Sequence, residues 1–294
     1  MQEWIVDVAE LQTLVTLAEM RSFSRAATAL HLSQPAVSKR IAVLEAELDV
    51  RLVHRIGRRI TLTDAGTALL PRARRVLEEI EDGRRALSRL SEHVGGRLSI
   101  GTSHHVGLHR LPDILRRYTS RYPDVDLDLR FMDSEDACAA VLRGELELGI
   151  VTLPPAPPPQ LETREVWPDP LAVFVAPQHP LAHVGRLKAG DLAPHPAVLP
   201  GASTYTCRLI LAELARHGIE PHIRLVTNYL ETIKMLVSIG LGWSLLPVHM
   251  ADATVHRLDI PELAVQRHLG VVWHARRTRS AAAQALMALM PAGR

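Results

Sequence analysis

Three histidines stand close together in the segment GTSHHVGLHRLP, which spans residues 101–112. His104, His105 and His109 follow the strand-like run Leu98–Ile100. A cluster of imidazoles can bind a transition metal, supply a catalytic base or line a pocket for a small molecule. It can also be an ordinary polar loop, so the surrounding elements have to decide between these possibilities.

A metal site is the sharpest of these possibilities, and the spacing supplies only half of it. His105 and His109 are four residues apart, which puts them on one face if the segment is helical. Gly107 lies between them, however, and the glutamate of an H-E-x-x-H zinc motif is absent. The first acidic residue that follows is Asp113, and the chain has no G-x-S-x-G nucleophile elbow. We therefore predict no catalytic residue, no metal and no cofactor, with a histidine-metal enzyme kept as an alternative.

The bulk composition describes a globular protein with room for two or three domains. Of 294 residues, 47% are hydrophobic and 22% are charged, as in globular rather than disordered proteins. The formal net charge is only +2, so any binding of nucleic acid has to come from a local basic patch.

Cysteine usage and the first residues favour the cytoplasm. Cys138 and Cys207 are the only cysteines and form no C-x-x-C pair, which argues against a disulfide framework or a zinc ribbon. The start MQEWIVDVAELQTLV has neither the basic beginning nor the apolar core of a signal peptide. No apolar run approaches the roughly 18 residues that indicate a membrane span. We expect a cytoplasmic chain without a membrane partner.

The first 62 residues have the pattern of a winged helix-turn-helix. Apolar residues recur at helical spacing over residues 11–18, and Ser22 and Ser33 can each cap a further helix. The helix from Ser33 reads SQPAVSKRIAVLEAEL, with Pro35 in its first turn, where a missing N–H costs nothing. Residues 51–62 then alternate around Gly57 like a small β-hairpin, which would be the wing.

Base readout and phosphate contacts are expected from different residues of this domain. The third helix should enter the major groove by its N-terminal end, where Gln34 can bond bidentately to adenine. Further contacts to bases are expected from Pro35, Ala36 and Ser38. Phosphate contacts are expected from Lys39, Arg40, Arg55, Arg58 and Arg59. For each arginine, a solvated surface charge is the alternative.

A long amphipathic helix follows from Thr63. Its apolar residues are spaced alternately four and three apart, as in the seam of a coiled coil. The seam consists of Leu69, Ala73, Val76, Ile80, Gly83, Leu87 and Leu90. A helix of this length with one apolar stripe needs a partner, so we predict dimerisation. Packing on the chain's own core is the alternative.

From Arg97 the pattern changes to alternating strands and helices, which predicts parallel sheets joined by helical crossovers. Strand-like runs lie at 98–101, 125–131, 148–153, 171–176, 223–227, 242–246 and 269–274. Helix-like runs lie at about 111–121, 134–143, 206–217, 229–239 and 279–290. The run Pro154–Pro159 interrupts the pattern as a stiff exposed connection. Because the pattern restarts after it, we predict two α/β lobes.

Hydroxyl-rich loops follow several of these strands, where open α/β sheets bind their ligands. Free backbone N–H groups at a helix start favour a small anion. The candidate effector-binding residues are Thr102, Ser103, His104, His105, Thr152, Ser203, Thr204, Tyr205, Thr206 and Asn228. For the serines and threonines, simple capping of a helix is the alternative.

Residues 11–66 resemble the DNA-binding domain of LysR-type transcriptional regulators. The matching stretches are FSRAATAL, SQPAVSKRIAVLEAELDVRLVHR and TLTDAG, and the phrase TIKMLVSIGLGWSLLP extends the match toward the C-terminus. The resemblance implies a mainly α winged helix-turn-helix, a long linker helix and an α/β two-lobed effector domain like a periplasmic binding protein. It also implies paired linker helices, a homotetramer, and two loops that face each other across an effector cleft.

The resemblance also sets the expected boundaries. We place the DNA-binding domain at residues 1–62, the linker helix at 63–94 and the effector domain at 95–294. Two crossovers should join the lobes, near Leu161–Trp167 and Leu263–Leu269. Lobe I would then comprise about 97–163 and 268–294, and lobe II about 164–267.

The sequence thus predicts a sequence-specific transcriptional regulator that is controlled by a small, anionic effector. Its expected partners are double-stranded promoter or operator DNA, the effector, further copies of itself and RNA polymerase. A solute-binding protein on the same scaffold is the alternative, and the complete helix-turn-helix argues against it. The segment GTSHHVGLHRLP would then form one wall of the cleft, with Thr102 and Ser103 as anchors.

Overall fold

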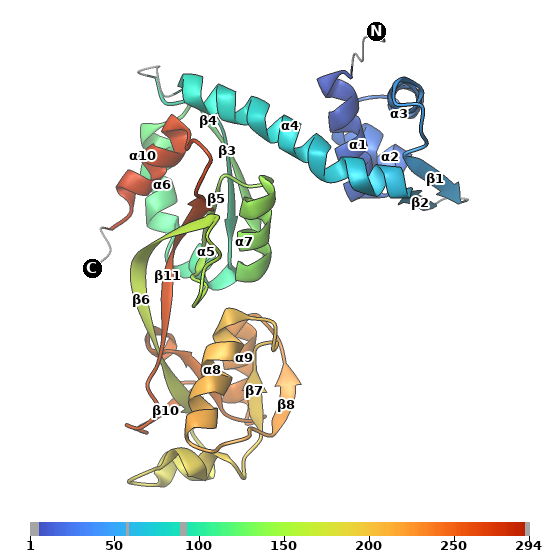
Figure 1. Ribbon diagram of the computed structural model, residues 1–294. Coiled ribbons are helices and arrows are strands. Elements are labelled where there is room, and N and C mark those ends of the chain that lie inside the picture. The colour runs from blue at the N-terminus through green and yellow to red at the C-terminus, as the bar shows by residue number, and fades with distance from the viewer. Residues whose placement is uncertain (1–5, 57–58, 89–92, 292–294) are drawn as a thin grey trace. The chain divides into compact units, whose positions relative to one another are not determined.

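The computed structural model describes residues 6–56, 59–88 and 93–291. The chain divides into two compact units, Met1–Leu87 and Ser88–Arg294, each with its own hydrophobic core (Figure 1). Within the described ranges, no helix combines the length and the apolar composition that crossing a membrane requires.

Three short helices form the core of the first unit. They are α1 (Val8–Met20), α2 (Phe23–Ala29) and α3 (Gln34–Glu47). Each begins at a capping side chain, namely Asp7, Ser22 and Ser33. The caps accept N–H groups that a helix start leaves without partners. The inward faces of the helices share one core, which includes Leu14, Leu17, Ala26, Val37, Ile41 and Leu44.

The predicted wing is an antiparallel hairpin of β1 (Val53–Ile56) and β2 (Arg59–Leu62). The buried side chain of Glu45, on α3, fixes its start. Glu45 Oε1 accepts hydrogen bonds from the backbone N–H groups of Leu52 (2.8 Å) and Val53 (3.2 Å). Because a carboxylate of α3 holds the first residues of β1, the wing and the predicted recognition helix are fixed in one arrangement.

The long helix α4 (Asp64–Ser88) begins against the wing. The Thr63 hydroxyl donates to the carbonyl oxygen of Arg51 (2.6 Å) and accepts the N–H of Gly66 (2.9 Å). A Cβ on Gly66 would collide with the carbonyl oxygen of Leu52. Only glycine therefore allows α4 to approach the wing this closely.

The apolar stripe of α4 divides into two parts. Ala73 is buried in the unit's own core, and Leu69 packs against the same core. Val76 and Leu87, by contrast, are 44% and 68% exposed. The first part of the stripe thus follows the alternative interpretation, packing on its own domain, and the second part is exposed in the single chain.

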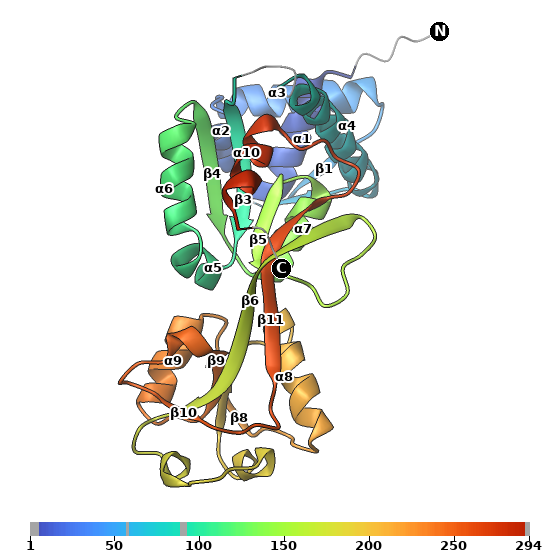
Figure 2. The same cartoon turned by 90° about the vertical axis from the view of Figure 1, so that its left-hand side faces the viewer.

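Lobe I of the second unit is a mixed sheet with the strand order β6-β11-β5-β3-β4 (Figure 2). Its strands are β3 (Gly96–Thr102), β4 (Val125–Phe131), β5 (Leu148–Thr152), β6 (Leu161–Val175) and β11 (Val265–His274). The first three run parallel, and β11 and β6 add antiparallel pairings. The helices are α5 (His104–His109), α6 (Pro112–Arg121), α7 (Ser134–Arg143) and α10 (Ala281–Leu289). Helices α6 and α10 share one core beneath the sheet, and α7 covers another.

Lobe II is built around the C-terminal part of β6 and the N-terminal part of β11. Its strands are β7 (Ala197–Leu199), β8 (Ile223–Val226), β9 (Ser244–Pro247) and β10 (His256–Leu258). Its helices are α8 (Tyr205–Arg216) and α9 (Leu230–Ser238), with short 3₁₀ turns at Pro180–His183, Ala189–Leu192 and Val248–Met250. Strands β7 and β8 pair in parallel, whereas β9 and β10 pair antiparallel to β6. Fully buried Trp243 lies in its main core.

The two lobes are joined by β6 and β11, which lie side by side along the unit (Figure 2). Val166 packs in the lobe I core and Leu171 in the lobe II core, so β6 crosses at 167–170. The first crossover therefore lies later than the predicted Leu161–Trp167, whereas the β11 crossing falls within the predicted Leu263–Leu269. At the register shift where β6 has the extra residue Val166, Gly270 of β11 has no room for a Cβ beside the carbonyl oxygen of Arg164.

Two sequence expectations differ from the observed fold. The seven-stranded sheet is mixed rather than parallel, because the chain crosses between the lobes on antiparallel strands. The run Pro154–Pro159 is a connection within lobe I, as the expected boundaries have it, since the chain re-enters lobe I as β6 after it. The histidine segment, weighed as a polar loop, forms helix α5 in spite of Gly107, whose missing Cβ leaves room for the Phe131 ring.

Candidate functional site

The N-terminal end of α3 carries the predicted base-reading residues. Gln34, Pro35 and Lys39 are exposed, and Ala36, Ser38 and Arg40 are half-buried. Gln34 Oε1 accepts a hydrogen bond from the hydroxyl of Ser24, on α2, at 3.1 Å. This bond orients the Gln34 amide on the protein side. Sequence reasoning missed Ser24, although it lies inside the FSRAATAL stretch.

Four predicted residues have no described side chain. Arg58 and Leu90 lie outside the described residues. The side chains of Arg55 and Arg59 also fall outside the description, although their backbones belong to β1 and β2. Their roles in DNA binding and dimerisation stay predictions.

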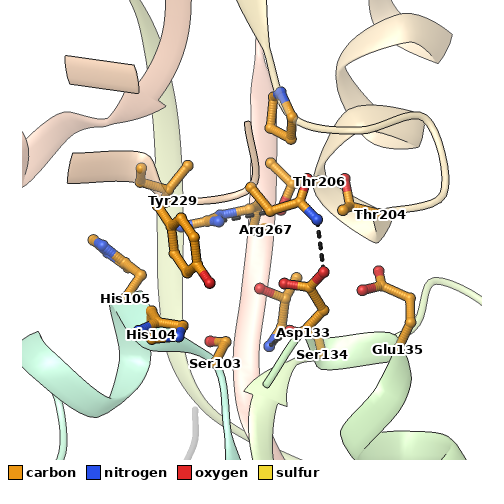
Figure 3. A pocket seen from close by; sticks show the side chains of 14 residues that line it. Ser103, His104, His105, Asp133, Ser134, Glu135, Thr204, Thr206, Tyr229 and Arg267 are labelled. Carbon is orange, nitrogen blue, oxygen red and sulfur yellow. Dashed lines mark hydrogen bonds between the residues drawn. The ribbon is translucent and has the colours of Figure 1, made fainter. Parts of the chain in front are cut away.

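A polar cleft lies between the two lobes of the second unit, with a cavity volume of about 50 Å³. In this arrangement the volume is below the roughly 300–1,000 Å³ that is typical of sites for small molecules. Figure 3 shows side chains of α5 and α7 facing those of lobe II across this space. The lining residues are Ser103, His104, His105, Asp133, Ser134, Glu135, Thr152, Pro200, Thr204, Thr206, Asn228, Tyr229, Leu230 and Arg267.

Seven of the ten predicted effector-binding residues line this cleft, namely Ser103, His104, His105, Thr152, Thr204, Thr206 and Asn228. The other three are placed differently. Thr102 is fully buried, and its hydroxyl donates to the carbonyl oxygen of Ile150 at 2.8 Å. Tyr205 packs against the α7 core of lobe I, and Ser203 is exposed outside the lining. Thr102 thus serves the sheet rather than the cleft.

The lining also includes residues that sequence reasoning missed. Asp133, Ser134 and Glu135 directly follow β4, so the rule about carboxyl ends of strands would have found them. Arg267 lies on the β11 crossing and has no comparable signal in the sequence, because its position depends on how two distant strands pair.

Asp133 and Glu135 of lobe I accept hydrogen bonds from lobe II across the cleft. Asn228 Nδ2 donates to Asp133 Oδ2 at 2.6 Å (dashed line at Asp133 in Figure 3). Asn228 Oδ1 accepts the N–H of Gly201 at 2.9 Å. The backbone N–H of Tyr205 donates to the carboxylate of Glu135. The structure therefore has its lobes in contact, with two carboxylates of lobe I against donors of lobe II.

The start of α8 is the position where an anion would be expected to bind, and Glu135 occupies it. Thr204 caps the helix by accepting the N–H of Cys207 at 3.1 Å, and Tyr205 gives its own N–H to Glu135. Burial raises the pKa of Glu135, although the hydrogen bond from Tyr205 opposes the shift. The carboxylate is thus held by a helix start, at a cost in desolvation.

A buried ion pair stands behind the cleft, on the strands that join the lobes. Arg267 and Asp169 are cross-strand partners of β11 and β6, and Arg267 Nε donates to Asp169 Oδ2 at 3.0 Å. Arg267 Nη1 also donates to Thr206 Oγ1 at 3.1 Å, which links this pair to α8. Arg110 adds a further bond to Asp169 at 3.3 Å. Removing one member of such a pair leaves an uncompensated buried charge.

The histidines of α5 point in different directions. The ring of His104 contacts the rings of Phe131 and Tyr229, with centroids 5.3 and 4.5 Å away. His105 and His109 instead reach one carboxylate of α9: His105 Nδ1 lies 3.2 Å and His109 Nε2 lies 2.8 Å from Glu231 Oε1. All three histidines therefore contact residues of lobe II, but only His104 and His105 line the cleft.

Electrostatics follow from these contacts. The hydrogen bond with His105 lowers the pKa of Glu231 to about 2. Burial lowers the pKa of His105, and the bond to Glu231 opposes that shift. Burial likewise lowers the pKa of His249 to about 4. The imidazoles of His105 and His249 are therefore neutral at pH 7, whereas Glu231 is an ionised carboxylate.

Both cysteines are buried free thiols. Burial raises the pKa of Cys138 to about 11 and also raises the pKa of Cys207. A thiol held in its neutral form is a poor nucleophile. Both thiols are therefore poor nucleophiles in this environment.

Family models match both parts of the chain. The model described as "Bacterial regulatory helix-turn-helix protein, lysR family" matches residues 8–67. The model described as "LysR substrate binding domain" matches residues 91–293. The two matches cover the helix-turn-helix with its wing and the two-lobed unit that holds the cleft.

Curated relatives and solved structures agree with these matches. The chain is 31% identical to the "Uncharacterized HTH-type transcriptional regulator YnfL" of Escherichia coli over 271 residues, which is 91% of each chain. It is 59% identical over 107 residues, 36% of this chain and 74% of the relative, to an uncharacterized HTH-type transcriptional regulator of Azotobacter vinelandii. A full-length OxyR variant from Pseudomonas aeruginosa has the same fold, with a TM-score of 0.73 and 24% identity over 97% of this chain and 94% of that one.

These relatives are named as transcriptional regulators and not as enzymes or solute-binding proteins. The winged helix-turn-helix, the linker helix and the two-lobed domain are the expected architecture, and the match of the second model alone covers more than half of the chain. The chain belongs to the LysR family of DNA-binding transcriptional regulators.

Proposed function

We propose that a small organic acid binds in the cleft between the lobes and thereby controls how the chain binds DNA. The observation that carries this proposal is the cleft, which draws polar side chains from both lobes and is bridged by hydrogen bonds. A ligand that contacts both lobes changes the free energy of closing them. It can therefore shift the population of DNA-binding states.

The negative group of the effector is assigned to the start of α8. The N–H of Tyr205 already holds a carboxylate there, that of Glu135. An effector carboxylate would take this place, because the helix start favours anions. Glu135 would then return to solvent, which is favourable because burial disfavours its charged form.

The remaining polar groups of the effector are assigned to the opposite wall. Asp133 and Glu135 are acceptors, so a ligand in contact with them needs hydrogen-bond donors. The Ser103 hydroxyl makes no capping bond to α5 and can serve the ligand. An acid that also carries a hydroxyl or an amino group fits this lining better than a bare inorganic anion does.

The proposal extends to partners and assembly. Gln34, Pro35, Ala36, Ser38, Lys39 and Arg40 would meet operator DNA, together with the wing arginines. The exposed part of the α4 stripe would pair two chains, and contacts between effector domains would complete a homotetramer. RNA polymerase would be the partner at the promoter, in the cytoplasm.

A screen followed by two matched variants tests the effector site. Thermal unfolding of the full-length chain is measured with carboxylic acids, with and without hydroxyl or amino groups, and with inorganic anions. A hit should raise the melting temperature, and calorimetric titration should give its Kd. Ser103→Ala should weaken binding about 5- to 10-fold, because one hydrogen bond contributes on the order of 1 kcal/mol.

The control is Ser203→Ala, since Ser203 was a predicted ligand residue but lies outside the lining. Equal affinity of Ser103→Ala and the parent chain would place the effector elsewhere, and a preference for cations would contradict the anionic group. Gel-shift titration on operator DNA selected from a random pool then measures whether the effector changes DNA affinity. An unchanged Kd with and without effector would overturn the regulatory part of the proposal.

A further inference from the structure

A group of potential metal ligands lies beside the cleft, where α5 of lobe I meets α9 of lobe II. It consists of His105, His109 and Glu231, and one ligand atom of each lies within 4.8 Å of the others. We propose that these three residues bind a divalent transition-metal ion, with zinc as the best match, and that this ion holds the two lobes together.

The distances suit tetrahedral coordination. With metal–nitrogen and metal–oxygen bonds of about 2.0–2.2 Å, two ligand atoms of a tetrahedral site lie roughly 3.3 Å apart. His105 Nδ1 and His109 Nε2 lie 3.2 and 2.8 Å from Glu231 Oε1. Because α5 is helical, the i, i+4 spacing brings the two imidazoles side by side, with ring centroids 4.7 Å apart and ring planes tilted by 47°. The acidic ligand that the local sequence lacks comes from α9.

The second ring nitrogen of His105 also needs a partner. Its side chain is only 5% exposed, and its Nε2 is buried without a hydrogen-bond partner among the described residues. Buried polar atoms without partners are rare and call for an explanation. When one ring nitrogen binds a metal, the other carries a proton and is usually offered to a carboxylate. Asp169 has a carboxylate oxygen within 4.8 Å of a ring nitrogen of His105, so it is the candidate to accept this proton.

Charge favours this group over its neighbour. His105, Asp169 and His249 also lie within ligand distance of one another, but Arg267 and Arg110 both donate to Asp169. Two guanidinium groups oppose a cation there. In the part of the chain that the structure describes, the Glu231 carboxylate is contacted by the two imidazoles and by no lysine or arginine.

The donor set selects the kind of ion. Magnesium and calcium prefer oxygen ligands, whereas two imidazoles and one carboxylate are a common set for zinc. His109 and Glu231 are 40% and 36% exposed, so an ion can enter from solvent and complete its coordination with water. The protein ligands come from both lobes, and the bound ion therefore stabilises the closed arrangement.

A metal that favours closure and an effector that bridges the lobes must strengthen each other's binding by the same factor. This coupling rests on the proposed function of the cleft, but metal binding itself does not. The test therefore uses the full-length chain without effector and without DNA, so that its failure and the failure of the proposed effector site are distinguishable.

The experiment titrates chelator-treated chain with Co²⁺ and follows visible absorption, then displaces Co²⁺ with Zn²⁺. We expect one Co²⁺ per chain with the intense bands of a tetrahedral site, and a higher melting temperature with Zn²⁺. His109→Gln and Glu231→Gln each remove a ligand. Each should weaken Co²⁺ binding at least about 100-fold, because even a lost outer-shell partner costs about 10- to 100-fold.

The matched control is His268→Gln. His268 Nδ1 lies 2.8 Å from Glu165 Oε1, so it forms a pair of the same chemistry, with no third ligand among the described residues. This variant should bind Co²⁺ like the parent chain. Melting temperatures in EDTA verify that each variant folds, and should one ligand variant unfold, the other decides. Parent-like affinity in a folded ligand variant, or the absence of the tetrahedral bands, would mean an adventitious ion only and would overturn the proposal.

Discussion

Glu135 is the residue at which the forces in the cleft oppose each other most directly. Its carboxylate accepts the N–H of Tyr205 at the start of α8, yet burial raises its pKa above the usual 4.5. A raised pKa means that the folded chain binds this proton more tightly than the unfolded chain. The stability contributed by the group is therefore present below pH 4.5 and is lost as the pH rises through the folded pKa.

Glu135→Gln should remove this dependence on pH while keeping an oxygen acceptor for Tyr205. We expect the melting temperature of Glu135→Gln minus that of the parent to become more positive between pH 4 and pH 7. Tryptophan fluorescence is a suitable probe, because Trp167, Trp243 and Trp273 all lie in the second unit. The exposed Glu220→Gln is the control. A difference that is constant over this range, or falls, would show that Glu135 is not destabilised by burial.

Gln34 and Lys39 should affect DNA binding in different ways. Gln34→Ala removes a base-reading amide, so affinity for the selected operator should fall by about 1–3 kcal/mol while affinity for other sequences is kept. Lys39→Ala removes a phosphate contact, so all sequences should bind more weakly and the salt dependence should become shallower. Competition gel shifts at two salt concentrations measure both effects. Identical behaviour of the two variants would contradict this division of roles.

Local chemistry predicted single site residues well only where one segment supplies both strand and loop. Ser103 and Thr204 each stand between a strand and a helix, and both line the cleft. Thr102, one position before Ser103, also has a hydroxyl group, but the pleat of β3 turns its side chain inward to Ile150. Arg267 and Glu231 became functional candidates only through contacts with residues about 100 positions away in sequence, which no local pattern encodes.

At the scale of elements, the junction of wing and long helix depends on one position without a side chain. Gly66 lies in the first turns of α4, where a Cβ would meet the carbonyl oxygen of Leu52. Gly66→Ala should therefore destabilise the first unit by about 1–3 kcal/mol, the usual cost of overpacking. Calorimetry of the full chain can measure this loss of stability. The transition of the first unit is the one whose melting temperature rises when DNA is added.

Gly83→Ala, in the same helix, is the matched control. Gly83 lies in the predicted seam, and within the single chain a Cβ there has open space around it, so alanine should stabilise the helix by about 0.5–1 kcal/mol through its better propensity. The two substitutions thus have opposite expected signs in one element. If both substitutions changed the stability equally, helix propensity and not the contact with Leu52 would determine the effect of Gly66→Ala.

Periodicity predicted helices better than it predicted sheet topology. The bounds of α7 agree with the expected 134–143, because capping and a helical apolar face are local properties. Only the last third of β6 was expected, since Glu162, Arg164 and Pro168 disrupt the apolar pattern before it. The earlier part is nevertheless a strand, because it pairs with β11 about 100 residues later.

At the scale of the whole molecule, the exposed part of the α4 stripe is the clearest reason to expect an assembly. Leu87 is 68% exposed and Val76 is 44% exposed on a face where Ala73, one turn earlier, is buried. Apolar side chains at this spacing are normally covered by a second helix. The first unit can cover only the start of the stripe, so the remainder is assigned to another chain.

Leu87→Glu should break this pairing, because a coiled-coil seam would then bury a carboxylate without a partner. We expect the mass measured by light scattering to fall by half, with unchanged melting of the second unit. Ala86→Glu, exposed on the same helix but off the stripe, should leave the mass unchanged. A Leu87→Glu chain with the parent's mass would show that the assembly does not depend on α4. In that case the paired DNA-binding domains would have to be joined by the effector units alone.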